Sequence, residues 1–296
     1  MMTSPSFYPI CLLLISAAVL ALESARPWRK DQKRMRPHLF SDLMHLVFNG
    51  HFLGVILFGI AAQYIIPHVD QWLAQANMQA ALYRNIFADL RLWVQIPLAL
   101  FLIDVLQWGV HITLHRVPFL WRFHQTHHSV VDGEMDFIVS FRFQWMEVVV
   151  YKTMLFMPMA WFGFSTTAIV VHAVFGTLIG HLNHANLNIS WGPLRYLLNS
   201  PRMHIWHHDY DQTAGKAVNF GIIFSCWDWM FGTAYLPEGS PKRIGFPGVE
   251  EFPTDFLSQT AWLGDAWGKA IGKLQVGPWI ARATGAALFT IGWWLH

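Results

Sequence analysis

The chain has 296 residues, of which 54% are apolar and only 13% are charged, and its net charge is +2. Soluble proteins carry about 25% charged residues, so the composition excludes an ordinary soluble protein and predicts a membrane protein. Six of the 20 lysines and arginines fall in one run, residues 26–36. This argues against nucleic-acid binding, because a nucleic-acid-binding surface spreads its lysines and arginines over one face of the protein. The two cysteines, Cys11 and Cys226, provide neither a disulfide framework nor a thiolate metal site.

The first two apolar stretches predict membrane helices. Residues 7–22 are uncharged and are expected to form an uncleaved anchor, with the basic run behind it on the cytoplasmic side. Residues 43–66 form a second stretch that is expected to end at Pro67, and residues 67–85 are expected to form a short external loop. Three polar residues of the second stretch are interpreted as partners in hydrogen bonds between helices: His45, Asn49 and His51.

The remaining apolar stretches complete an all-α integral membrane bundle of about four to six spans. Residues 86–110 are expected to run back to the cytoplasmic face, and residues 145–182 suit a helical hairpin that turns near Gly163. Residues 185–275 are richer in glycine, proline and charge, which is typical of a cytoplasmic or interfacial segment. Residues 276–295 are apolar again and predict either a last span or an interfacial helix.

Ten of the 16 histidines form four clusters between residues 111 and 208. Residues three and four apart share one face of a helix, so each cluster directs two or three imidazoles to one side. Pro118 lies between the first two clusters and allows the chain to turn so that they converge. Asp104 precedes the first cluster on the same helix face and is expected to accept an imidazole N–H. The clusters are His111 with His115, then His124, His127 and His128, then His181 with His184, then His204, His207 and His208.

This clustering predicts metal binding at a cytoplasmic-facing, histidine-rich helical cap. A single buried histidine is usually a packing residue, but ten together would repel one another if protonated and would each need a partner if neutral. A metal ion binds neutral imidazole and removes both difficulties. Because a metal such as zinc takes three or four protein ligands, ten histidines imply two ions. Imidazole suits zinc, copper, iron and nickel, so the residues alone leave the metal open.

Six segments of the sequence resemble the histidine boxes and the characteristic ending of the fatty acid hydroxylase and sterol desaturase superfamily of integral membrane oxygenases. The HxxxH form of the first box resembles the sterol desaturase-like branch. The segments are residues 104–116, 120–129, 184–186, 200–208, 219–221 and 227–233.

The resemblance implies an O₂-dependent di-iron enzyme that hydroxylates or desaturates an unactivated C–H position of a sterol, fatty acyl, ether-lipid or carotenoid substrate. It implies a catalytic domain at residues 86–236, between N-terminal membrane helices with a basic loop (1–85) and a C-terminal segment (237–296). Asp104 and Asn219 are expected beside the cofactor. Ten histidines are candidate ligands of two iron ions: His111, His115, His124, His127, His128, His184, His204, His207 and His208, with His181 as the tenth.

Two kinds of partner are expected. A lipid enters from the bilayer, and aromatic residues near the boxes either line its slot or anchor the protein at the interface. No nucleotide-binding motif is present, so the electrons are expected from a separate ferredoxin or cytochrome with its reductase. The aromatic residues are Trp108, Trp121, Phe123, Phe141, Phe143 and Trp145. Five arginines either bind lipid headgroups or an acidic electron carrier, or extend to the membrane surface, which is the expected role of each one: Arg116, Arg122, Arg142, Arg195 and Arg202.

Two alternatives compete with this hypothesis. A dizinc membrane hydrolase would use a metal-bound hydroxide as its nucleophile and would need neither O₂ nor a reductant. A metal transporter would place its polar site near the bilayer midplane, whereas these histidines are expected at helix ends. The sequence leaves the oligomeric state open.

Overall fold

The computed structural model describes residues 4, 6–131, 134–214 and 216–262. Within these residues the chain is helical, as predicted, and two isolated bridges take the place of β-strands. Helix α1 (Phe7–Ala25) has a mean hydropathy of 1.9 and buries only Val19. An apolar helix with so little buried surface is typical of a lipid-facing span.

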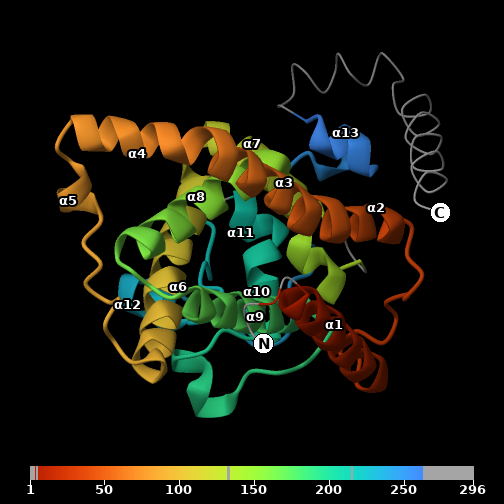
Figure 1. Cartoon of the computed structure of the whole chain (residues 1–296). Helices are drawn as coiled ribbons and strands as arrows, with labels where there is room; N and C mark the ends of the chain where they lie inside the picture. The colour runs from red at the N-terminus through yellow and green to blue at the C-terminus, as the bar shows by residue number, and fades with distance from the viewer. Residues whose placement is uncertain (1–3, 5, 132–133, 215, 263–296) are drawn as a thin grey trace.

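Five helical segments lie end to end along one side of the molecule (Figure 1). The helix therefore continues past Pro67, where the sequence predicted an end, because proline is tolerated in the first turn of a helix. The predicted external loop contains the end of this run and the short α5 (Gln79–Leu82). The segments are α2 (Leu39–Met44), the π-helix η1 (His45–Phe52), α3 (Leu53–Ile60), the π-helix η2 (Ala61–Ile65) and α4 (Ile66–Gln75).

Hydrogen bonds between helices are expected for all three polar residues of this run, and two of them, His45 and Asn49, form such bonds to the helix Phe256–Thr260. His45 Nε2 bonds to Gln259 Oε1 at 2.8 Å, and the Asn49 amide donates to the carbonyl of Phe143 at 2.8 Å. His51 instead donates to the carbonyl of Leu46 in its own helix.

Two consecutive helices carry the first two histidine clusters, and the chain bends between them. Helix α6 (Leu92–Arg116) is 25 residues long, and α7 (Pro118–His128) starts directly after it. The chain turns at Val117, whose extended backbone (φ −94°, ψ 112°) separates the two helices. Pro118 occupies the first turn of α7, so the predicted break between the first two histidine clusters is confirmed.

The predicted hairpin over residues 145–182 is also confirmed. Helix α8 (Trp145–Trp161) and helix α9 (Thr166–His184) flank a turn in which Gly163 has φ +79°. A side chain at Gly163 would clash with the backbone of Asn85, so this turn requires glycine.

Short helices complete the described part of the chain. They are the 3₁₀-helices η3 (Phe137–Phe141), η4 (Gly192–Tyr196), η5 (Ile205–His208) and η6 (Val249–Glu251), and the α-helices α10 (Pro201–His204), α11 (Tyr210–Ala214), α12 (Cys226–Phe231) and α13 (Phe256–Thr260).

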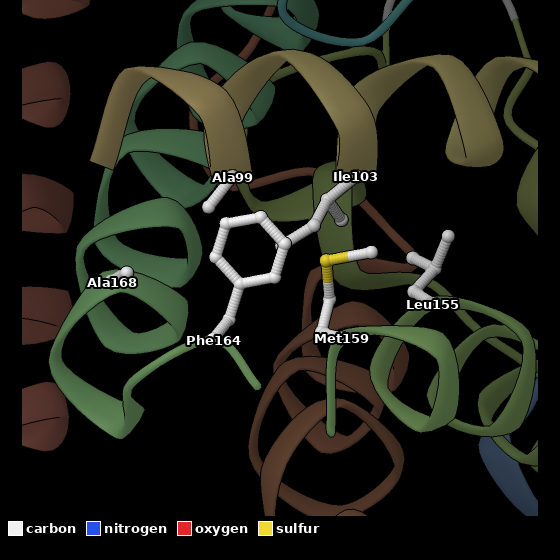
Figure 2. Packing of buried hydrophobic residues seen from close by; sticks show 6 residues of the cluster. All are labelled: Ala99, Ile103, Leu155, Met159, Phe164 and Ala168. Carbon is white, nitrogen blue, oxygen red and sulfur yellow. The ribbon is translucent and has the colours of Figure 1, made fainter. Parts of the chain in front are cut away.

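An apolar core joins α6, α8 and α9 at the end distant from the histidines. Figure 2 shows the ring of Phe164, from the hairpin turn, lying between Ala99 and Ile103 of α6 and Met159 of α8. This packing fixes the hairpin against α6, so that the opposite ends of the three helices meet at the histidine region.

Three helices of the described chain are long and apolar enough to cross a membrane: α1, α6 and α9. The predicted four to six spans therefore remain a prediction, as do the cytoplasmic orientation and the domain boundaries. The apolar stretch 276–295 lies outside the described residues.

Candidate metal centre

The structure brings nine of the ten predicted histidines together in two groups. They come from the ends of α6 and α9, from α7, and from the α10–η5 turn. We call the first the five-histidine group and the second the four-histidine group. The five-histidine group is His111, His115, His124, His128 and His207, and the four-histidine group is His127, His184, His204 and His208.

The two HxxHH boxes are shared between the groups. In α7, His124 and His128 belong to the five-histidine group, whereas His127 belongs to the other. In the α10–η5 turn the assignment is reversed, since His204 and His208 belong to the four-histidine group and His207 does not. Each box thus supplies an i, i+4 pair to one group and its middle histidine to the other.

The imidazole nitrogens lie at the spacing of ligands around one ion. His111 Nε2 lies 3.1 Å from His124 Nε2, His115 Nε2 lies 3.2 Å from His207 Nε2, and His184 Nε2 lies 3.2 Å from His127 Nε2. Ligands at about 2.1 Å from a metal are about 3.0 Å apart at right angles and about 3.4 Å apart in a tetrahedron. The observed spacing therefore fits two imidazole-bound ions.

Unpaired nitrogens inside the cluster support this fit. Both ring nitrogens of His128 and of His208 are buried without a hydrogen-bond partner in the described structure. Burial, followed by the charges of neighbouring histidines, holds the pKa of both residues well below the usual value for histidine. They are therefore neutral near pH 7, which is the form that binds metal.

Acceptors on the far side of four rings orient them toward the groups. His111 Nδ1 donates to the carbonyl of Phe220 at 2.8 Å, His207 Nδ1 to that of Val218 at 2.7 Å, and His184 Nδ1 to that of Gly180 at 2.8 Å. His124 Nδ1 donates to Glu147 Oε1 at 3.0 Å. With Nδ1 protonated and held, Nε2 is the nitrogen left free for metal.

Asp104 supports the site differently from the prediction. Its carboxylate accepts the backbone N–H groups of Ile223 and Phe224 and the indole N–H of Trp227, at 2.8 to 3.0 Å. Seven residues of helix place it about 10 Å along the axis from His111, which is too far for a hydrogen bond to that imidazole. Asp104 instead anchors the segment that supplies the backbone acceptors.

Asn219 and Asp228 hold the same segment. Asn219 adopts φ +57°, accepts the N–H of Tyr235 and donates to the carbonyl of Met203. Asp228 accepts the N–H groups of Phe220 and Gly221. A side chain at Gly221 would clash with the carbonyl oxygen of Phe224. Asn219 thus positions the carbonyls on either side of it, and its own side chain bonds to the protein backbone.

His181 is the predicted ligand that the structure leaves outside both groups. Its Nε2 lies 3.0 Å from Ser16 Oγ and its Nδ1 lies 2.7 Å from Ser140 Oγ, so both nitrogens have partners. It joins α1, α9 and η3, which is the structural role of an ordinary buried histidine.

Glu147 was not anticipated from the sequence. It is 0% exposed, and its contact with His124 makes it the carboxylate beside the metal groups. The available signal was its position as an isolated acid in the apolar stretch 145–182, since an ionisable residue within a membrane segment commonly marks a functional site.

Arg142 does not lie at the membrane surface. It is 1% exposed and donates to Asp42 Oδ1 at 2.8 Å and to Ser129 Oγ at 2.9 Å. Asp42 also pairs with Arg36, whose guanidinium binds Asp136 at 2.8 and 2.9 Å. This buried ionic network joins the basic run to the end of α7, because burial requires the charges to be paired.

A cavity of about 170 Å³ borders both histidine groups. His111 and His124 reach it from the five-histidine group, and His127 and His184 reach it from the four-histidine group. Of the six aromatic residues predicted near a slot, Phe141 and Phe143 line this cavity. A ligand in it would therefore touch both groups at once.

Comparison with known proteins supports a functional role for the histidine-rich region. The model of the fatty acid hydroxylase family matches residues 96–233. Ornithine lipid hydroxylase OlsE of Rhizobium tropici is 26% identical over 253 residues, which are 84% of this chain and 73% of that protein. No solved structure gives a significant match.

Two other relatives match less than half of the chain. Alkylglycerol monooxygenase of Xenopus tropicalis is 31% identical over 149 residues, covering 48% of this chain and 31% of that protein. Very-long-chain aldehyde decarbonylase GL1-6 of Oryza sativa subsp. indica is 28% identical over 142 residues, covering 44% of this chain and 21% of that protein. The region matched by the family model contains both histidine groups, and this region of the chain is similar to the fatty acid hydroxylase family.

Proposed function

We propose that this membrane protein is an O₂-dependent di-iron hydroxylase that acts on an aliphatic C–H bond of a lipid. The observation that carries the proposal is a cavity that is bordered by histidines of both groups. Two iron ions, bound by the five-histidine and four-histidine groups, would supply O₂ activation, which redox-inert zinc does not provide.

The residues of the chain bind the lipid and orient the ligands. Phe141, Phe143, Val148 and Leu155 give the cavity apolar walls, which favour an alkyl chain and exclude water from the metal side. Glu147 and the backbone carbonyls around Asn219 hold the imidazole rings in place.

The relatives suggest substrates to test first. The protein matched over most of its length is named for ornithine lipid hydroxylation, so an ornithine lipid is the leading substrate and an alkylglycerol is the next. Electrons come from a separate ferredoxin or cytochrome with its reductase, which docks on the cytoplasmic side where the histidine boxes lie. The protein crosses the membrane several times.

The test is incubation of membranes containing the full chain with ornithine lipid, a reducing system and ¹⁸O₂. We expect one ¹⁸O atom in a hydroxylated product, with iron bound to the protein. His127→Ala should abolish the product while the protein stays in the membrane. His68→Ala, at an exposed histidine of α4 that bonds to the carbonyl of Tyr64 in the adjoining η2, should not abolish it. Turnover of lipid without O₂ or reductant, by protein that contains zinc, would instead establish the hydrolase.

A further inference from the structure

The cavity beside the histidine groups has a second end, which is polar. It is formed by Lys152 of α8 and His172 of α9. His172 precedes His184 by twelve residues on α9, which is about 18 Å at 1.5 Å per residue. Ala173, Gly176 and Gly180 line the cavity between these two positions on α9, so the cavity suits an elongated molecule with one polar terminus.

His172 is a buried imidazole without a partner. It is 5% exposed, and neither Nδ1 nor Nε2 forms a hydrogen bond in the part of the chain that the structure describes. Buried polar groups in proteins are nearly always paired. Because His172 lines the cavity, a molecule in the cavity is in a position to supply that partner.

Lys152 has no ion pair among the described residues, and its Nζ lies 5.1 Å from the ring centroid of Phe156, which also lines the cavity. Lys152 is exposed and also lines the cavity, which places it at an opening. The acidic residue of its own helix, Glu147, is engaged by His124. Lys152 is close enough to His172 for their charges to interact. A lysine side chain that extends toward water needs no ion pair, which would account for Lys152. It would not account for His172, whose two ring nitrogens stay unpaired.

We propose that Lys152 and His172 bind an anionic oxygen group of the lipid substrate, a carboxylate or a phosphate, and thereby determine which carbon reaches the histidine groups. This inference rests on the proposed function, since it assigns the polar end of the same substrate site. An ammonium and a neutral imidazole both donate hydrogen bonds to such a group, and the apolar walls take the alkyl chain.

Equilibrium binding to the full chain in nanodiscs tests the site. The probes are palmitate, hexadecyl phosphate and hexadecanol, which differ in the terminal group of the same C16 chain. We expect at least one anion to bind about tenfold or more tightly than hexadecanol, and the preferred anion identifies the headgroup chemistry. Lys152→Met should remove this preference, and His172→Leu should reduce it.

Two controls separate binding from loss of structure. Lys152→Arg should retain the anion preference, and Lys242→Met, which removes an exposed lysine outside the cavity, should leave it unchanged. Metal content should be the same in all of these variants. Equal affinity of the unmodified protein for all three probes, or an anion preference that survives in Lys152→Met, would overturn the proposal.

The position of hydroxylation distinguishes this proposal from the proposed function. In the same preparations, Lys152→Met should yield a mixture of hydroxylated positions where the unmodified protein yields one. One unchanged position would overturn the anion site and leave the hydroxylase intact. Anion binding that depends on Lys152, without any oxidation of lipid, would support the site and contradict the hydroxylase.

Discussion

Replacing Glu147 tests whether the buried carboxylate tunes the metal site. Glu147 accepts the Nδ1 hydrogen of His124 at 3.0 Å, and its other oxygen, Oε2, has no partner in the described structure. Two cations bound nearby would favour the carboxylate form of Glu147. Glu147→Gln keeps the shape and a neutral acceptor, whereas Glu147→Leu leaves the His124 N–H unpaired in a buried position.

The size of the effect follows from this one hydrogen bond. A hydrogen bond to a charged group contributes about 1.5 to 3 kcal/mol, and a tenfold change in affinity corresponds to about 1.4 kcal/mol. Loss of the bond should therefore weaken metal binding by about 10- to 100-fold, which is the range found for partners of metal-bound histidines. Glu147→Leu should show the full loss and Glu147→Gln a smaller one.

The assay is retention of iron during titration with a chelator, followed by elemental analysis of the protein. Glu238→Gln, at an exposed acid, controls for the loss of one negative charge. If both Glu147 variants retained iron as tightly as the unmodified protein, the assignment of Glu147 as the partner of a metal-bound histidine would be refuted.

Two further predictions concern the histidines. His128→Gln should lower bound metal, whereas His181→Gln, which changes a histidine paired with two serines, should leave metal content unchanged; elemental analysis of both checks this, and equal losses would contradict the two-group assignment. The metal-free protein should lose stability as the pH falls below about 6.5, because burial keeps the folded-state pKa of His128 and His208 well below that of the unfolded chain, which then binds more protons. Melting temperatures from pH 7.5 to pH 5 measure this, and a flat profile would contradict it.

The spacing of histidines along the sequence predicted the nine residues that meet, but it also included His181, which lies outside both groups. Helical periodicity places His111 with His115 and His124 with His128, and the structure confirms both pairs in one group. Helical periodicity could not predict that His127 and His207, the middle histidines of their boxes, each join the other group. That depends on how α7 and the α10–η5 turn pack against each other. Whether the nine residues bind iron remains a prediction.

Supporting residues were harder to predict, for physical reasons. The expectation for Asp104 used its helix face alone, and the axial distance to His111 excludes the contact. The acceptors for His111 and His207 are backbone carbonyls, which every residue possesses and no side-chain pattern reveals. Pro67 predicted a helix end, but a proline in the first turn of a new helix segment permits the run to continue.

Each histidine box contributes to both groups, and this would couple the binding of one metal ion to the binding of the other. His127 is adjacent to His128 in α7, yet the two serve different groups, and the same holds for His207 and His208. Filling one group orders both boxes, and that conformational entropy is then no longer lost when the second ion binds. If each group binds one ion, we therefore expect positively cooperative binding, so that a partly loaded preparation should contain molecules with two ions and molecules with none, with few that hold one.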